Sequence, residues 1–128
     1  VGIHMKAYED QVPIIVIGGN TGSFLGEYMA GGVIIVLGLH GKGGPAVGSF
    51  LGSGMHGGAI YVRGKVEARC LGEGAALAEP DEADWEKLRL YLTEYCADFG
   101  LDPAEVLAGG FVKVAPRSHR PYGSLYAY

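Results

Sequence analysis

Residues 22–38 read GSFLGEYMAGGVIIVLG, and residues 48–64 read GSFLGSGMHGGAIYVRG. The two segments are identical at eleven of 17 positions, so the second is a repeat of the first. A shorter copy of the strand-like part, IIVIG, precedes them, so successive copies end at Gly18, Gly38 and Gly64. These ends are 20 and 26 residues apart. One short strand in roughly every 20 residues is typical of a solenoid, in which each coil stacks on the previous one.

The connections between these strands argue against two other arrangements. Antiparallel hairpins need turns of about two to five residues, and these connections are much longer. A parallel pair could be joined by a helix, but Gly costs about 1 kcal/mol relative to Ala inside a helix, and the connections are rich in Gly. The longer interval is explained by the loop 39–45, LHGKGGP. We therefore predict a single-stranded right-handed parallel β-helix of about three coils in residues 1–78.

Aligning the three strands on their final Gly predicts which side chains face the interior. Two columns are wholly aliphatic and should point inward, since alternate residues of a strand share a face: Ile14/Ile34/Ile60 and Val16/Val36/Val62. The other two columns end in Tyr61 and Arg63, which we expect at or near solvent. Because those columns are otherwise apolar, we also expect another element to cover them.

Glycines recur at the positions where the coils must turn. A corner needs a positive φ and a neighbouring backbone about 4.8 Å away, and Gly meets both needs without strain. The predicted corner glycines are Gly22, Gly26, Gly31, Gly32, Gly38, Gly48, Gly52, Gly57, Gly58 and Gly64. Between the corners, the repeated pairs should fill the interior: Phe24/Phe50, Leu25/Leu51 and Met29/Met55.

From residue 79 the chain becomes poor in Gly and rich in charge, which predicts a helical appendix over residues 79–128. Asp81 is a suitable N-cap and Gly100 a suitable end for a long helix. Apolar residues recur every three to four positions and define its buried face: Trp85, Leu88, Leu92, Tyr95 and Phe99. A second short helix should begin at Asp102–Pro103 and end at Gly109, followed by a last strand over residues 111–114. We expect the long helix to cover the apolar outer columns of the coils.

Composition narrows the class of protein. The 128 residues are 48% hydrophobic with a formal net charge of -4, which favours one folded domain and disfavours nucleic acid as a partner. No apolar run approaches the roughly 18 residues of a membrane span, and no signal peptide is evident. Cys70 and Cys96 lack CxxC spacing, so structural thiols in a reducing compartment are favoured over a disulfide or metal pair, and we expect a cytoplasmic location. The chain begins with Val1, and we expect it to be part of a longer protein.

Some residue patterns resemble known kinds of site. Gly52–Gly57 matches GxGxxG, but a strand follows it where a dinucleotide site needs a helix, so we interpret it as a coil corner. The histidines are His4, His40, His56 and His119, and their scatter predicts no metal site. No catalytic constellation is evident. Loop and tail cations remain candidate partner contacts: His40, Lys42, Arg117, His119 and Arg120.

The repeated element Gly-x-x-Met-x-Gly-Gly-x-Ile-x-Val-x-Gly is met with the same spacing at residues 26–38 and at residues 52–64. It resembles the GXGXG domain that closes the large subunit of glutamate synthase. The resemblance implies a parallel β-helix lying between an amidotransferase part and an FMN/Fe–S synthase part, around a path for ammonia. It also implies that FMN and Fe–S belong to those partners. It transfers no catalytic, cofactor-binding or metal-binding residue to this chain.

The resemblance leads us to expect a structural subunit or domain of a glutamate-synthase-like complex. Two related roles remain open, one in N-methylglutamate synthase and one as a non-catalytic component of formylmethanofuran dehydrogenase. A third alternative, from a different class, is an independent ligand binder that uses the loop 39–45 and the cationic tail. An exposed coil end would also allow the chain to associate with itself.

Overall fold

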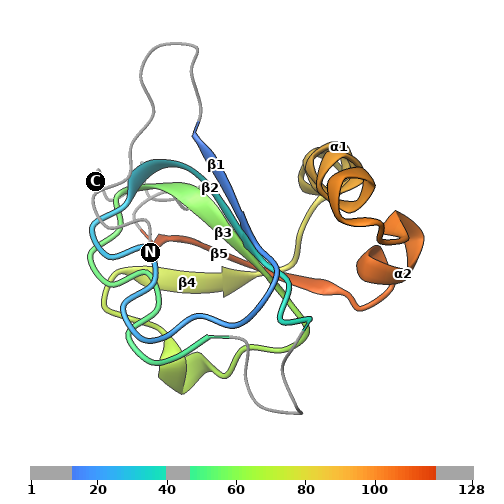
Figure 1. The fold of residues 1–128 in the computed structure, drawn as a ribbon. Helices are drawn as coiled ribbons and strands as arrows, with labels where there is room; N and C mark the ends of the chain where they lie inside the picture. Colours follow the sequence, from blue (N-terminus) through green and yellow to red (C-terminus); the bar gives the residue numbers. More distant parts are fainter. Residues whose placement is uncertain (1–12, 40–46, 118–128) are drawn as a thin grey trace.

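The computed structural model describes residues 13–39 and 47–117 (Figure 1). These residues form one mixed sheet with the strand order β1-β2-β3-β5-β4. The strands are β1 (Ile14–Ile17), β2 (Ala30–Val36), β3 (Gly57–Arg63), β4 (Ala75–Ala78) and β5 (Phe111–Pro116). A short 3-10 helix spans Ala68–Cys70, and two α-helices follow β4: α1 (Glu82–Phe99) and α2 (Pro103–Leu107).

The predicted closed, single-stranded parallel β-helix is wrong. Strands β1, β2 and β3 are parallel as expected, but β5 runs in the opposite direction and lies between β3 and β4. Val114 of β5 pairs with Ile60 on one side and with Leu77 on the other. The sheet is therefore open and mixed. The apolar pattern of residues 111–114 predicted a strand correctly, but such a pattern contains no information about direction or partners.

The turns before β2, β3 and β4 nevertheless stack in register. Leu51 donates its N–H to the carbonyl of Cys70 at 2.8 Å, and Gly72 donates to the carbonyl of Leu51 at 2.7 Å. We call the three stacked turns the turn rungs: residues 22–28, 48–54 and 68–74. The sequence comparison did not reveal the third rung, because only Leu71, Gly72 and Gly74 are identical to the matching residues of the second rung.

The strand register was predicted correctly for one pair and wrongly for the other. In β2 and β3, Val36 lies opposite Val62, as the repeat alignment predicts. In β1, however, Val36 pairs with Ile17 and not with Val16. The alignment had matched Gly18 to Gly38, whereas Gly38 donates its N–H to the carbonyl of Gly19. This slip of one residue exchanges the two faces of β1.

Each face of the sheet packs against its own apolar core. The turn-side core lies between the sheet and the turn rungs and consists of Leu25, Met29, Ile34, Val36, Val47, Leu51, Met55, Ile60, Val62, Ala75 and Val114. The helix-side core lies between the sheet and the helices and consists of Val33, Ile35, Leu37, Tyr61, Leu88, Leu92, Cys96, Val106 and Phe111. Figure 1 shows the rungs and the helices on opposite sides of the strands.

Two expectations about burial are corrected. Phe24 and Phe50 do not fill the interior: they are exposed and stacked on one another, with ring centroids 4.8 Å apart. The accompanying pairs Leu25/Leu51 and Met29/Met55 are buried as predicted. Tyr61 was expected near solvent but is only 1% exposed. Its hydroxyl led us to expect solvent there, but the side chain points toward α1, which covers this face of the sheet.

The glycines expected at corners differ in conformation. Positive φ values occur at Gly26, Gly32, Gly38, Gly52, Gly58 and Gly64, and the other four have ordinary φ values. Gly58 illustrates why a side chain cannot be present. Its φ is 81°, and a Cβ there would lie 2.7 Å from the carbonyl oxygen of Gly32 on the neighbouring strand.

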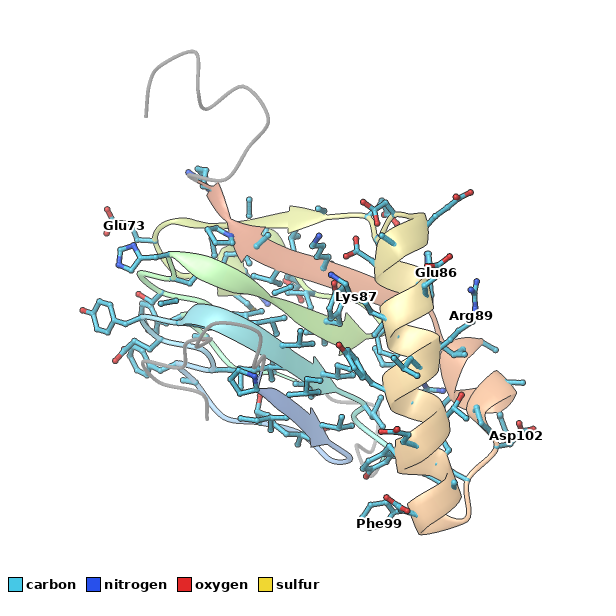
Figure 2. All side chains as sticks on the ribbon, turned by 90° about the horizontal axis from the view of Figure 1, so that it is seen from above. Glu73, Glu86, Lys87, Arg89, Phe99 and Asp102 are labelled. Carbon is cyan, nitrogen blue, oxygen red and sulfur yellow. The ribbon has the colours of Figure 1, made fainter. Side chains whose placement is uncertain are left out.

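The helical appendix follows the sequence prediction closely. Asp81 caps α1, and Gly100 ends it in the left-handed conformation with φ 68°. Three residues on the sheet-facing side of α1 are fully buried: Leu88, Leu92 and Cys96. Figure 2 shows that α1 runs across the strands. The last turn departs from the prediction, because Phe99 is 65% exposed. Neither helix of the described segments is both long and apolar enough to span a membrane.

Candidate functional site

A buried polar cluster joins α1 to the sheet. The Asp84 carboxylate, at the beginning of α1, is almost fully buried. Tyr61 donates its hydroxyl to Oδ1 of Asp84 at 2.6 Å. Lys113 donates Nζ to Oδ1 at 3.0 Å and to Oδ2 at 3.2 Å, and the N–H of Asp81 donates to Oδ2 at 2.9 Å. Both carboxylate oxygens are therefore occupied by protein donors.

Local structure brings the three side chains together. Asp84 is the third helical residue and forms a reciprocal capping box with Asp81, which fixes its position at the start of the helix. Tyr61 and Lys113 are direct partners in the antiparallel pairing of β3 and β5, so they share the face covered by α1. Sequence reasoning missed this cluster, because the pairing of β3 with β5 was not foreseen. The only available signal was a Lys in an otherwise apolar strand.

The electrostatics of the cluster favour a structural role. Burial raises the pKa of the Asp84 carboxyl, but hydrogen bonds from Tyr61, the Asp81 backbone and Lys113 outweigh burial and hold this pKa below its usual range. Burial and the hydrogen bond to Asp84 raise the pKa of the Tyr61 hydroxyl far above its usual range. At neutral pH the carboxylate is charged and the phenol is neutral. A carboxylate with a low pKa and fully occupied oxygens is a poor general base, so the cluster fastens the helix to the sheet.

An open groove of about 560 Å³ lies at the carboxyl end of α1. Its lining is partly apolar and partly charged: Leu39, Arg63, Tyr95, Phe99, Leu101, Asp102, Glu105 and Val106. Arg63 donates Nε to the carbonyl of Val106 at 2.9 Å. A Cβ at Gly109 would collide with the Arg63 guanidinium, so this Gly makes room for it. Within the described part of the chain, no ion pair joins Arg63 to Asp102 or Glu105, the two acidic residues of the lining.

Of the five candidate partner contacts, only Arg117 falls in the described part of the chain. Arg117 is exposed at the end of β5, where its N–H donates to the carbonyl of Gly74 at 2.6 Å. Its guanidinium donates to the carbonyl of Ala75 at 3.3 Å. The remaining four lie outside the described residues: His40, Lys42, His119 and Arg120.

The other motifs have plain structural positions. Gly52–Gly57 leads directly into β3, so no helix follows it. Cys70 and Cys96 are free thiols, and Cys96 is buried. Burial, followed by the charge of Asp102, raises the pKa of the Cys96 thiol. In the segments 13–39 and 47–117, no group of three or more His, Cys, Asp or Glu side chains could hold a metal ion.

Comparison with known proteins gives two matches. A family model described as the GXGXG motif matches residues 2–118. The chain is also 50% identical, over 132 residues, to an uncharacterized protein of Methanocaldococcus jannaschii. That alignment covers 98% of this chain and 50% of the relative. The chain therefore spans about half the length of the curated relative that it matches.

Proposed function

The chain belongs to the GXGXG motif family, and from this premise we propose that it is a structural, non-catalytic unit of a glutamate-synthase-like complex. The family match fits a glutamate synthase-like domain. In the proposed assembly, the chain holds an amidotransferase part and a synthase part in a fixed relative position. Ammonia released from glutamine then reaches 2-oxoglutarate without escaping into solvent. FMN and Fe–S centres belong to the partners, and the complex is cytoplasmic.

The observation that carries this proposal is the extent of the match. The family model covers the turn rungs and the helical appendix together, from residue 2 to residue 118. In the structure, the Asp84 cluster and the helix-side core join these two parts across one sheet. A spacer between two enzymes needs a fixed shape, because reaction rates depend on the relative position of the reacting centres. A body with apolar cores on both faces of a sheet suits that need.

Reconstitution tests the proposal. The chain is combined with the amidotransferase and synthase subunits of the same organism, and glutamate formation is measured with either glutamine or ammonia as nitrogen donor. Omitting the chain should lower the glutamine-dependent rate by about tenfold or more and leave the ammonia-dependent rate unchanged, because only the transfer between sites is lost. Glutamine hydrolysis by the chain alone, or full glutamine-dependent activity without it, would contradict the proposal.

The groove at the carboxyl end of α1 favours a second candidate, an independent ligand binder. Arg63 and the pair Asp102 and Glu105 present opposite charges at separate points of one groove. This arrangement suits a small zwitterion such as an amino acid. Calorimetric titration of the chain with glutamate and with glutamine tests this candidate. Saturable binding that is lost in Arg63→Gln would support it, and the absence of heat with either amino acid would exclude those ligands.

A further inference from the structure

Three exposed aromatic side chains lie along the turn rungs. Phe24, Tyr28 and Phe50 are 43%, 49% and 53% exposed. Each also has a positive φ, at 63°, 55° and 58°, a conformation that bulky residues rarely adopt. Neither burial nor backbone preference therefore explains an aromatic residue at these positions. Exposed strained residues of this kind are typical of binding surfaces.

The rungs place these rings in two columns. The first column contains Phe24, Phe50 and Cys70, and the two rings are stacked 4.8 Å apart with an angle of 6° between them. This distance equals the usual spacing of neighbouring strands, so each rung adds one ring to the stack. The third rung breaks the column, because Cys70 has no ring. The first column therefore shows that aromatic rings on neighbouring rungs can stack in parallel.

The second column contains Tyr28, Gly54 and Gly74. The rungs are in register here, since Tyr28 donates its N–H to the carbonyl of Ser53 and Gly54 donates to that of Glu73. The Tyr28 ring occupies the side-chain space of Gly54, because a Cβ at Gly54 would lie 2.7 Å from Cδ1 and Cε1 of the ring. A Cβ at Gly74 would meet no atom within 4 Å. The space that Tyr28 fills over Gly54 is thus open one rung further on.

This open space belongs to a groove of about 390 Å³, lined by Tyr28, Ser53, Gly54, Met55, His56, Glu73 and Gly74. Glu73 is the acidic residue of the lining, and among the described residues no Lys or Arg lines the groove. Glu73 is exposed and lies at the end of the molecule away from α1, where Figure 2 labels it. The guanidinium of Arg117, on the adjoining end of β5, is directed to the carbonyl of Ala75. The groove therefore combines an aromatic wall, a bare glycine floor and a negative charge.

We propose that this groove docks a partner protein through an aromatic side chain that stands next to a Lys or Arg. The aromatic ring lies over Gly74 and continues the column that Tyr28 begins, while the cation pairs with Glu73. Tyr28 itself shows that a ring fits against the glycine backbone of the next rung. The inference rests on the proposed function, because a scaffold needs docking surfaces, and it names one such surface and the chemistry of its partner.

A titration of the complete chain with short peptides tests the docking chemistry. The probe is a capped Gly-Lys-Trp-Gly peptide, and two matched peptides replace Trp by Leu or Lys by Glu. Amide resonances of Gly54 and Gly74 should shift with the probe. Replacing Trp by Leu should weaken binding by about tenfold or more, since aromatic anchors carry most of the binding energy. Replacing Lys by Glu should also weaken binding, because the new carboxylate is repelled by Glu73. Equal shifts with all three peptides, or shifts elsewhere only, would overturn the inference.

Substitutions separate the groove from other exposed apolar surface. Tyr28→Asn removes the ring but keeps a residue that tolerates positive φ, and it should abolish the response to the probe. Leu90→Asn removes an exposed apolar side chain of α1 that lines neither groove and should leave the response unchanged. Thermal unfolding of both variants checks that each is folded. Probe binding that survives Tyr28→Asn would overturn the inference.

The reconstituted complex distinguishes this inference from the proposed function. If the wild-type chain assembles with its partners, Tyr28→Asn and Glu73→Gln should each weaken that assembly. Assembly that is unaffected by both substitutions would overturn the docking inference and leave the scaffold role intact. If the wild-type chain fails to assemble at all, the proposed function is wrong, and the peptide titration alone decides whether the groove docks an aromatic residue.

Discussion

The turn-side core and the helix-side core lie on opposite faces of one sheet, yet they are specified in different ways. The turn-side core is entirely apolar, and its elements are positioned by backbone hydrogen bonds between stacked rungs. The helix-side core includes Tyr61 and borders the Asp84–Lys113 ion pair. Apolar contacts alone would allow α1 to pack on the sheet in several positions, whereas the directional hydrogen bonds to Asp84 select one of them. Glycine contacts and backbone hydrogen bonds thus align the turn rungs, whereas the polar cluster at Asp84 sets where α1 lies on the apolar helix-side core.

The largest effect is expected at the glycine contact between β2 and β3. Gly58→Ala places a Cβ 2.7 Å from the carbonyl oxygen of Gly32 in a backbone conformation that Ala disfavours. We expect the free energy of unfolding to fall by about 3 kcal/mol or more, measured by urea denaturation. Gly22→Ala is the matched control, because its Cβ would meet no atom within 4 Å. Similar losses in the two variants would show that backbone approach does not specify the turn side.

A large cavity in the helix-side core tests whether the two cores unfold together. Leu92→Ala should lower the free energy of unfolding by about 2–4 kcal/mol, since Leu92 is fully buried. Because β5 contributes Phe111 to one core and Val114 to the other, we expect one transition. Trp85 fluorescence and far-UV circular dichroism should give the same midpoint. Separate midpoints would mean that the helical side unfolds by itself. Leu90→Ala, at an exposed site, is the control and should change the free energy of unfolding little.

The polar cluster should respond to loss of its charge. Asp84→Asn keeps the size of the side chain but removes the ion pair with Lys113, and we expect a loss of about 2 kcal/mol at pH 7. Because the pKa of Asp84 is lower in the folded state, its contribution is present above about pH 4 and is lost as the pH falls through the folded value. When denaturation is repeated from pH 7 down to pH 2, the free energies of unfolding of the wild type and the variant should therefore converge. A difference that is constant over this range would refute the charge-based explanation.

Tyr61→Phe should have a smaller effect at neutral pH, about 1–2 kcal/mol, because it removes one hydrogen bond to a charged acceptor. The alkaline range gives a distinct signature. The pKa of Tyr61 is raised in the folded state, so above about pH 10 the unfolded chain loses this proton while the folded chain retains it. The stability of the wild type should then fall more steeply with pH than that of the variant. Parallel pH profiles would argue against burial of this hydroxyl.

The smallest effect is expected at the exposed Phe24–Phe50 stack. Phe24→Asn removes the stacking with Phe50 but replaces a strained aromatic residue by one that accepts positive φ. These two changes oppose one another, and we expect the free energy of unfolding to change by less than about 1 kcal/mol. Differential scanning calorimetry of Phe24→Asn beside Leu25→Ala, its fully buried neighbour, provides the contrast. A loss at Phe24 equal to that at Leu25 would assign the stack to the core.

Local signals predicted local structure well. The caps at Asp81 and Gly100 and the apolar spacing of residues 85–92 located α1, because these features act within one helix. The eleven identities in 17 positions between the two repeats predicted the pairing of Val36 with Val62 correctly. The first copy misled the alignment: its four identities in five positions favoured Gly18 opposite Gly38, whereas Gly38 donates its N–H to the carbonyl of Gly19.

The errors concern contacts between distant segments. Nothing in residues 111–116 indicates that this strand enters the sheet between β3 and β4, so the closed β-helix and the position of Lys113 could not be foreseen. The outward direction of Phe24 and Phe50 was missed for another reason. Hydrophobic residues in a repeat are usually buried, and only the exposure of these two rings in the structure shows that they point away from the core.

The position of β5 has a consequence for biosynthesis. The strand that fills the gap between β3 and β4 begins at Phe111, so both of these strands keep an unsatisfied edge while the intervening helices emerge from the ribosome. The high contact order of such a topology slows folding, and open edges invite pairing with other nascent chains. Completion of the sheet therefore waits for a segment that is synthesised after the other four strands and both α-helices, and the open edges of β3 and β4 stay available for wrong pairing until it appears.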